Sequence, residues 1–384
     1  MKILIVASWF PDGESPFSGV FIAEQARALA SKAAGHEVTV VSPVVIPAGK
    51  MRHRMVEERD GYKVIRTSLP ARNVVHQFDY ARAIVSEIRT SECDVVHAHV
   101  TLPAGFASVL AARWTGRPVV ITEHRGPFSA LMETARDRFK VRFALERADA
   151  VLAVSNSLAE EMRSHGVTRT IKVVPNIVDQ RRFPLTPKTR QSGEPYKLLF
   201  AGILRDHNKN LPLLLRALKQ LLDARGDFRL TIVGDGEVRY ECEDLARQLG
   251  VSEQCVFRGA LPPDEVAREI AASDLFVLPS RSETFGIVAA ESLSMGRPVV
   301  ATRCGGPEDF VSDSNGALVP VDDEEALSDA IARVSSSLDD YSAVKLSAYA
   351  QERFGDQTVT SQLTDIYREV SQTSARSRRA ALML

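Results

Sequence analysis

The stretch from residue 275 to residue 302 limits the possible folds of this chain more than any other. Leu275–Leu278 is an apolar run of strand length, polar residues follow it, and apolar residues resume at Phe285. After a turn at 296–298 comes a second strand-like run that ends at Thr302. Strand, helix and strand in this order predict a parallel crossover, because the helix returns the chain to the starting edge. Since loops at the carboxyl ends of parallel strands hold ligands, we expect a site in the polar turn 279–284.

Two acidic residues border the predicted helix, whose start we expect near Phe285. Glu283 lies just before that start and Glu291 lies roughly two turns into the helix, which separates the two acids by about 12 Å. The first amides of a helix have no partner within it and its dipole is positive there, so they suit a phosphate group. Carboxylates accept hydroxyl protons, so we expect the two acids to hold the ends of one elongated ligand, such as a sugar and a ribose. The alternative is a solvated loop acid and an ordinary polar position on a helix.

The residues around these acids resemble the signature of glycosyltransferase family 4. The resemblance covers Ser-Glu-Thr-Phe-Gly-Ile-Val-Ala-Ala-Glu at 282–291, the continuation at 292–302, and Gly-Gly-Pro-Glu at 305–308. Members of that family are retaining enzymes that use nucleotide sugars and have the B-type glycosyltransferase fold. The resemblance therefore implies an α/β protein with two doubly wound, Rossmann-like parallel-sheet domains that face a cleft.

Length and charge agree with two domains. A chain of 384 residues and 42.2 kDa is too long for one ordinary hydrophobic core. Prolines and glycines punctuate residues 184–195, so we expect an acceptor-side domain at 1–185 and a nucleotide-sugar-binding domain at 186–360. A helix and tail at 361–384 would cross back to the first domain, as the resemblance implies. The formal net charge of −1 argues against a dedicated nucleic-acid binder.

The cysteines and the apolar segments indicate the compartment. Four cysteines are scattered without a Cys-x-x-Cys pair, which favours reduced thiols and a cytoplasmic protein over a disulfide framework or a zinc site. No apolar run approaches the ~20 residues that span a bilayer, so we expect a soluble or peripheral protein. The basic and then apolar tail 376–384 leaves two readings open, a frayed terminus or weak attachment to the inner face of a membrane.

Three residues of the first domain are candidates for donor contacts. Gly19 lies in the turn after the first strand, where relatives place a Gly-Gly pair against the donor phosphates, and here the pair is Ser18-Gly19. His124 follows the predicted strand 118–122, and in related transferases the histidine at this place contacts the donor sugar and supports the reaction centre. Asn176 belongs to a segment that resembles the Pro-Asn-Gly-Val-Asp of the family. The alternatives are a glycine that only makes the turn and a structural loop histidine.

Other features of the first domain remain open. His97 and His99 lie two apart, and structural or substrate-contact roles suit them better than metal binding, since the other usual ligands are missing nearby. Residues 44–72 contain a basic cluster and a predicted hairpin turn at Asp60-Gly61, and this insertion is where acceptor specificity would lie. We expect one helix over 128–147, whose arginines and lysine fall on opposite sides and so favour a solvated helix over a membrane-binding face.

Cations in the second domain suit a diphosphate. Lys209 fits the family lysine that follows the first strand of this domain, and Arg205 stands slightly later than the usual arginine, where Ile203 or Leu204 replaces it. Two positive charges there would neutralise the diphosphate and the charge that develops as it leaves. Arg205 either contacts the ligand or faces water.

Further donor contacts follow from the same resemblance. Gly234 and Asp235 form a glycine turn that lacks the third glycine of a dinucleotide motif, which argues against nicotinamide binding. The resemblance assigns the nucleobase edge to the segment of Phe257 and Arg258. It assigns the sugar and its phosphate to Glu283 and to three amides, those of Phe285, Gly286 and Ile287. Glu291 would hold the ribose.

These observations predict a retaining glycosyltransferase that moves a sugar from a nucleotide diphosphate sugar, with UDP or GDP as carrier, to an acceptor hydroxyl. Glycan, glycolipid, cell-envelope polysaccharide and natural-product glycoside synthesis all fit this activity. Lys209, Glu283 and His124 are the candidate catalytic residues, and no metal or other cofactor is needed where cations neutralise the leaving group. A nucleotide-sugar epimerase and a non-catalytic partner subunit of the same fold remain as alternatives. Base, sugar, acceptor and oligomeric state stay open.

Overall fold

The computed structural model describes residues 1–13, 17–46, 54–70, 76–188, 190–191 and 193–382. It contains two compact units, one formed by Met1–Ile177 with Asp356–Leu384 and the other by Val178–Gly355. Both chain crossings lie earlier than the expected boundaries at 185 and 360. The reason at the first crossing is local, because the Val178 amide donates to the Phe354 carbonyl (2.9 Å) and the Phe183 carbonyl accepts from Ser294 (2.8 Å).

The first unit is built on a sheet with strand order β3-β4-β2-β1-β5-β6-β7-β8. The β3–β4 pair is antiparallel and the other described pairs are parallel. The strands are β1 Lys2–Ala7, β2 Glu37–Ile46, β3 Arg54–Arg59, β4 Tyr62–Pro70, β5 Val95–His99, β6 Val119–Glu123, β7 Ala150–Ala153 and β8 Ile171–Val173. The order grows in both directions from β1, so the sheet is doubly wound with its switch point between β1 and β5.

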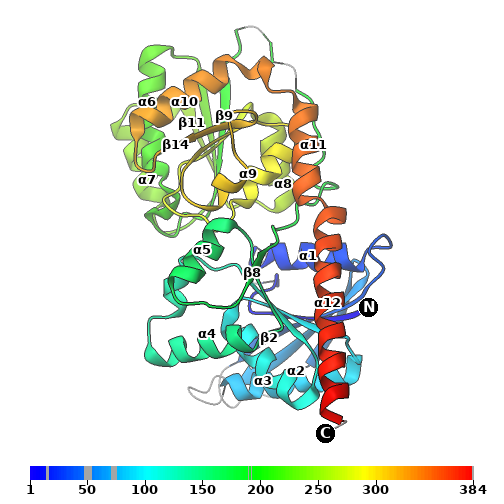
Figure 1. The fold of residues 1–384 in the computed structure, drawn as a ribbon. Coiled ribbons are helices and arrows are strands. Elements are labelled where there is room, and N and C mark those ends of the chain that lie inside the picture. Colours follow the sequence, from blue (N-terminus) through cyan, green and yellow to red (C-terminus); the bar gives the residue numbers. More distant parts are fainter. Residues whose placement is uncertain (14–16, 47–53, 71–75, 189, 192, 383–384) are drawn as a thin grey trace. The chain divides into compact units, whose positions relative to one another are not determined.

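The helices of the first unit are α1 Val20–Ala30, α2 His76–Ser91, α3 Phe106–Thr115, α4 Ala135–Arg147, α5 Asn156–Ser164 and the last helix α12 Asp356–Leu382. In α12, Val359, Leu363, Ile366, Tyr367 and Val370 recur at helical spacing and are buried in the core of this unit. The guanidinium of Arg27 on α1 binds both carboxylate oxygens of Asp356 (2.8 and 2.9 Å). The final helix is therefore part of the first unit, side by side with α1 (Figure 1).

The second unit has a parallel sheet with strand order β11-β10-β9-β12-β13-β14. Its strands are β9 Tyr196–Ala201, β10 Phe228–Val233, β11 Cys255–Gly259, β12 Leu275–Leu278, β13 Val299–Thr302 and β14 Gly316–Val319. Its helices are α6 Leu211–Ala224, α7 Arg239–Gln248, α8 Pro263–Ala272, α9 Ile287–Ser294, α10 Glu324–Ser336 and α11 Ala343–Phe354. Figure 1 shows α6, α7 and α10 on one face of the sheet and α8, α9 and α11 on the other. The predicted class of two doubly wound α/β sheets is confirmed.

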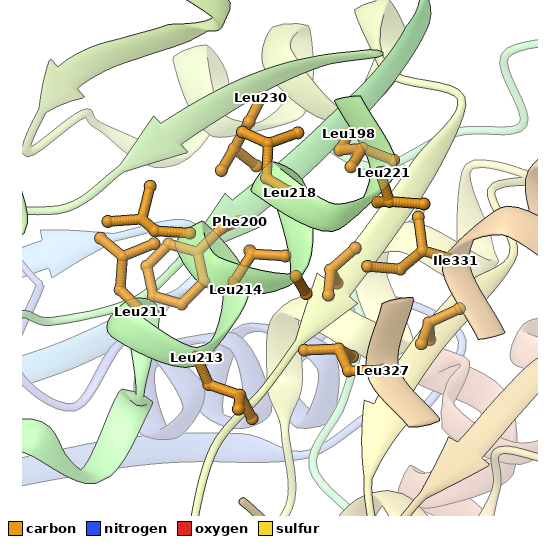
Figure 2. Close-up of a cluster of buried hydrophobic side chains, with 14 of the residues drawn as sticks. Leu198, Phe200, Leu211, Leu213, Leu214, Leu218, Leu221, Leu230, Leu327 and Ile331 are labelled. Carbon is orange, nitrogen blue, oxygen red and sulfur yellow. The ribbon is translucent and has the colours of Figure 1, made fainter. Parts of the chain in front are cut away.

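One face of the second sheet packs against α6 and α10. The leucines at 211, 214, 215 and 218 recur at helical spacing in α6 and are all buried, where they meet strand residues such as Leu198 and Phe200. Figure 2 shows Leu327 and Ile331 of α10 closing the same cluster. Burial of this many leucine, isoleucine and phenylalanine side chains is the main source of stability of the unit, at about 1.5–3 kcal/mol each. This packing holds β9 and β12 rigidly, and their following loops carry the candidate site.

Two expectations about single elements have clear outcomes. The hairpin is confirmed, since Asp60 (φ 47°) and Gly61 (φ 86°) connect β3 to β4 in the left-handed turn that hairpins favour. The single helix over 128–147 is wrong. A short 3-10 turn covers Phe128–Leu131, and α4 begins separately because Thr134 caps it by accepting a hydrogen bond from the Asp137 amide (3.1 Å).

Several expectations concern residues beyond the structural description. Of the basic cluster Lys50, Arg52, His53 and Arg54, only Arg54 is described, and it forms an ion pair with Glu87 (2.8 Å). The rest of the cluster and part of the proposed acceptor-specificity insertion lie outside the described residues. Of the tail, α12 continues to Leu382, and nothing about its side chains after residue 374 is described. Within the described part of the chain, no helix combines the length and the apolar character required to cross a bilayer.

Candidate active site

The candidate site of the second unit lies at the carboxyl edge of its sheet, at the switch point between β9 and β12. The loop after β9 is joined to the loop after β10, because the Leu204 amide donates to the Asp235 carbonyl (3.0 Å). It is also joined to the loop after β12, since the Asn208 side-chain amide donates to the Ser282 carbonyl (2.9 Å). The fold thus brings together three segments that sequence reasoning had singled out separately, as expected for a ligand site in a doubly wound sheet.

Lys209 and Glu283 form an ion pair at this edge. The Lys209 Nζ atom contacts Glu283 Oε1, and the Ser280 hydroxyl donates to the same oxygen at 2.7 Å. The Glu283 side chain is only 10% exposed and that of Lys209 24%, so water screens the pair poorly. The lysine stem packs against Gly202, where an added Cβ would lie 3.2 Å from Lys209 Cδ. Sequence reasoning assigned these two side chains to different parts of the donor, and the structure places them in direct contact.

The backbone around Glu283 corrects the predicted helix start. Helix α9 begins at Ile287, and Gly286 precedes it with φ 86°, outside the helical region. The chain before it is extended, because the Glu283 amide donates to the Cys304 carbonyl (2.7 Å) and its carbonyl accepts from the Gly306 amide (2.8 Å). This pairing with the 304–306 segment keeps the chain extended up to Phe285. Glu291 therefore lies little more than one turn into the helix, and the estimate of eight helical residues between the acids was wrong.

The start of α9 presents unpaired backbone donors. Among the described residues, the amides of Phe285, Gly286 and Ile287 donate no hydrogen bond. The Phe285 ring is buried against Phe310 and Phe354, with centroids 5.6 and 5.4 Å away, so only its backbone is available to a ligand. A segment with three adjacent donors at a helix start suits an anion such as a phosphate group.

The remaining predicted donor contacts of this unit differ in their availability. Asp235 forms an ion pair with Arg239 (3.3 Å) and Arg258 one with Glu269 (2.9 Å), while Phe257 packs on the hydrophobic core. Arg205 is exposed, and no ion pair of its side chain occurs within the described chain. Glu291 is half-buried on α9. The side chains of Asp235 and Arg258 would have to leave their partners to reach a nucleotide, whereas their backbone would not.

Two of the predicted glycines are required by the backbone itself. Gly19 precedes α1 with φ 70°, and an added Cβ would lie 2.4 Å from the Trp9 carbonyl oxygen. At Gly234 an added Cβ would lie 1.9 Å from the Gly202 carbonyl oxygen. No side chain fits at such distances, and a left-handed φ is costly for other residues. The structural reading of both glycines is thus supported, and a contact with donor phosphates stays a prediction.

His124 lies in a buried polar cluster of the first unit. It is 8% exposed, its Nε2 atom is 2.9 Å from His99 Nδ1, and the Phe21 ring of α1 lies 4.5 Å from its own. Burial lowers the pKa of His124 to about 3, a hydrogen bond with the Asn176 side chain acts in the opposite direction, and the ring is neutral near pH 7. Asn176 is itself 9% exposed. The structure therefore brings His124 and Asn176 into the same buried environment.

Sequence reasoning gave no role to Glu123, which holds the loop that carries His124. Its carboxylate is fully buried and accepts hydrogen bonds from the amides of Thr101 (2.9 Å), His124 (2.8 Å) and Arg125 (2.8 Å). Burial nevertheless raises the pKa of Glu123. An acid at the carboxyl end of a buried strand was the available signal, because only a structural or functional task keeps a carboxylate inside a protein.

Metal binding and thiol chemistry find little support in the described part of the chain. No three histidine, cysteine, aspartate or glutamate side chains there form a group that could hold a metal ion. The four cysteines are unpaired, and burial raises the pKa of Cys93 and Cys242 to about 11 and that of Cys255 and Cys304 to about 12. These thiols stay protonated at neutral pH, which makes them poor nucleophiles.

Comparison with known proteins agrees with this architecture. The model of Glycosyltransferase Family 4 matches residues 18–182, and that of Glycosyl transferases group 1 matches residues 183–353. A GDP-mannose-dependent alpha-mannosyltransferase of Mycobacterium tuberculosis is 32% identical over 78% of this chain and 80% of its own length. A sulfoquinovosyl transferase of Arabidopsis thaliana is 30% identical over 60% of this chain, which matches only 46% of that relative's length.

A solved structure shows the same fold over nearly the whole chain. The Anabaena protein HepE in complex with UDP superposes with a TM-score of 0.74 at 19% identity, covering 96% of this chain and all of the other. The matched family models, the similar mannosyltransferase and the two doubly wound sheets lead to one conclusion. This chain belongs to glycosyltransferase family 4, among the glycosyl transferases of group 1.

Proposed function

We propose that this protein moves a sugar from a nucleotide diphosphate sugar to an acceptor hydroxyl, with retention at the anomeric carbon. The observation that carries the proposal is the set of free amides at Phe285, Gly286 and Ile287 beside the Lys209–Glu283 ion pair. Donors of hydrogen bonds and a cation at one edge of a sheet suit a diphosphate, and a nearby carboxylate suits sugar hydroxyls. The family membership of the chain supports the same assignment.

In this proposal the reaction breaks the bond between the anomeric carbon and the phosphate oxygen and forms one to the acceptor oxygen. Negative charge develops on the departing diphosphate, where Lys209 and the amides before α9 stabilise it more in the transition state than in the ground state. The acceptor hydroxyl gives its proton to the leaving phosphate. Since Lys209 contacts Glu283, a sugar whose hydroxyls donate hydrogen bonds to Glu283 also sets the position of the lysine.

The donor base and the sugar are a finer part of the proposal. The similar mycobacterial mannosyltransferase depends on GDP-mannose and the HepE structure holds UDP, so both nucleotides belong in a test. Glu291 on α9 is our candidate for the ribose hydroxyls. In the first unit, His124, Asn176 and Gly19 are the candidates for contacts with the donor, as the family resemblance implies.

The direct test measures release of nucleoside diphosphate from UDP-sugars and GDP-sugars, with and without hydroxyl acceptors such as monosaccharides, inositols and glycosides. Transfer predicts release that depends on an acceptor and a product whose anomeric configuration, read by NMR, equals that of the donor. Rearrangement of the nucleotide sugar without an acceptor would identify an epimerase instead. Absence of turnover and of donor binding across the panel would contradict the proposal.

A further inference from the structure

A chain of buried side chains connects the last helix to His124. It consists of Tyr367, His97, Gln25, His99 and His124, and we call it the histidine relay. Its contacts are Tyr367 Oη to His97 Nδ1 (2.7 Å), Gln25 Nε2 to His97 Nδ1 (3.4 Å) and to His99 Nε2 (3.3 Å), and His99 Nδ1 to His124 Nε2 (2.9 Å). All five residues are less than 9% exposed, so bulk water does not compete with these contacts.

Gln25 sets the direction of the relay. Its side-chain nitrogen can only donate, so His99 Nε2 must accept and carries no proton. Burial holds the pKa of His99 well below its usual value, so the ring is neutral and has a single proton. That proton is therefore on Nδ1, from which His99 donates to His124 Nε2.

The same reasoning fixes the tautomer of His124. Its ring is also neutral, and because Nε2 accepts from His99 the single proton must lie on Nδ1. The Nδ1 atom is buried and has no hydrogen bond of ordinary geometry among the described residues, and the Asn176 side chain is the polar group that interacts with this ring and raises its pKa. A buried donor without a partner is costly, and such an atom in a native structure calls for an explanation.

The hydrogen bonds of His97, near the other end of the relay, also assign its single proton to one nitrogen. His97 Nε2 lies 2.7 Å from the Thr122 hydroxyl, and burial keeps the pKa of Tyr367 far above its usual value, so the tyrosine remains a donor. Tyr367 and Gln25 both donate to His97 Nδ1, which leaves the His97 proton on Nε2 to bind Thr122. Every contact then has one donor and one acceptor, and the only surplus proton of the relay is on His124 Nδ1.

We propose that His99, oriented by Gln25, is a positioning residue that fixes His124 as a neutral Nδ1–H donor for an oxygen atom of the bound substrate. The proposal rests on the proposed function and makes its chemistry specific. His124 would donate to a sugar hydroxyl or a phosphate oxygen and could not serve as a general base, because its lone pair is used by His99. His97 and Tyr367 would act one step further away by orienting Gln25 and the sheet edge.

The tautomer can be read in the unaltered protein. Selective 15N labelling of histidine followed by long-range 1H–15N spectra distinguishes protonated from unprotonated ring nitrogens, and His124→Asn assigns the His124 signals by their loss. We expect protonated Nδ1 and unprotonated Nε2 on both His99 and His124 throughout the range from pH 5 to pH 8. A proton on Nε2 of His124, or a charged ring at neutral pH, would overturn the proposal.

Two variants of Gln25 test whether the tautomer matters for the reaction. Gln25→Glu offers an acceptor to His99 Nε2 and should reverse the relay, so that the His124 proton moves to Nε2. Gln25→Met keeps the length of the side chain without either hydrogen bond and leaves the tautomer unforced. We expect Gln25→Glu to lower kcat/KM by about tenfold or more, the effect of losing one hydrogen bond to the substrate, and Gln25→Met to lower it less. A reversed His124 tautomer in Gln25→Glu with unchanged kcat/KM would contradict the proposal.

Two variants of His99 test whether its N–H donor or only its bulk is needed. His99→Asn retains an N–H in the place of Nδ1–H, whereas His99→Phe has similar bulk and no donor. The activity of the protein and the tautomer of His124 should be retained in His99→Asn and lost in His99→Phe. Equal loss in both folded variants would indicate a packing role for His99 and contradict the proposal.

Binding measurements distinguish whether the oxygen that accepts from His124 belongs to the sugar or to the phosphate. In His124→Phe, weaker binding of a nucleotide sugar with unchanged binding of UDP or GDP places the oxygen on the sugar, and weaker binding of both places it on the phosphate. Unchanged binding and turnover of the whole donor would contradict the donor role. The tautomer spectrum needs no turnover. Its result can therefore be judged even if the release assay contradicts the proposed function.

Discussion

At the scale of single residues, the Lys209–Glu283 contact is the sharpest determinant of the proposed chemistry. Replacing Lys209 by alanine removes the cation that faces the departing diphosphate and leaves Glu283, 10% exposed, without its counter-charge. We expect kcat to fall by about 100-fold, the usual effect of losing one preorganised electrostatic contact. Lys219→Ala is the matched control, since that lysine pairs with Asp223 on the surface of α6 and should leave turnover unchanged. Turnover of Lys209→Ala within a few fold of the wild type would remove the lysine from the reaction centre.

Gly19 gives a second prediction at this scale, about stability. Gly19→Ala forces a side chain into a left-handed backbone and against the Trp9 carbonyl, which should cost at least about 1–2 kcal/mol of unfolding free energy. Urea denaturation measures the loss. Gly13→Ala serves as control because an added Cβ there meets nothing within 4 Å. Equal stability of the two variants would show that the turn can relax.

At the scale of elements, α12 is attached to α1 by the pair of Arg27 and Asp356. The Arg27 side chain is only 7% exposed, and it also donates to Glu24 (2.8 Å). Asp356→Ala should therefore destabilise the first unit by about 2–3 kcal/mol, because the buried Arg27 guanidinium loses its bidentate carboxylate partner. Asp365→Ala on the same helix removes an exposed ion pair with Arg368 and should change the unfolding free energy by less than about 0.5 kcal/mol. Similar urea midpoints for both variants would contradict this account.

At the scale of the whole molecule, the buried histidines should make stability strongly dependent on pH. Burial lowers the pKa of His97 and of His124 to about 3 and holds that of His99 well below its usual value. Their full stabilisation is present above about pH 6.5, and it is lost as the pH falls towards 3, because only the unfolded state then takes up protons. Each of these histidines contributes a slope of about 1.4 kcal/mol per pH unit in that window.

The measurement is the unfolding free energy of the protein from pH 7 to pH 4. Below pH 6.5, we expect His97→Gln to reduce the slope of unfolding free energy against pH by the contribution of about one proton. His207→Gln, which alters an exposed histidine, should leave this slope unchanged. The raised pKa of Glu123 acts in the opposite direction above about pH 4.5, since the folded state then holds the additional proton. A slope that His97→Gln does not alter would mean that the ring is not neutral in the folded protein.

The apolar runs of the chain predicted its alternating strands and helices, and the resemblance to glycosyltransferase family 4 implied their arrangement in two doubly wound sheets. Alternation of strands and helices predicted parallel sheets, and the glycine turns, the Asp60–Gly61 hairpin and the apolar side of α6 were readable locally, because each depends on neighbours a few residues apart. The same pattern named the loop after β12 as a site segment, and the family resemblance added the loop after β9. It misplaced the start of α9, because pairing of Glu283 with the distant 304–306 segment, rather than local helix propensity, decides where that helix begins.

By itself, then, the amino-acid sequence determined the two-sheet architecture, the family and most of the residues in the candidate site. Only the tertiary structure decided which of them meet: Lys209 reaches Glu283 across 74 residues, and Tyr367 reaches His97 across 270. It also decided that His124 is neutral and that its proton is on Nδ1. The physical reason is that burial and hydrogen-bond direction depend on neighbours supplied by other strands and helices, and no local pattern encodes those distances.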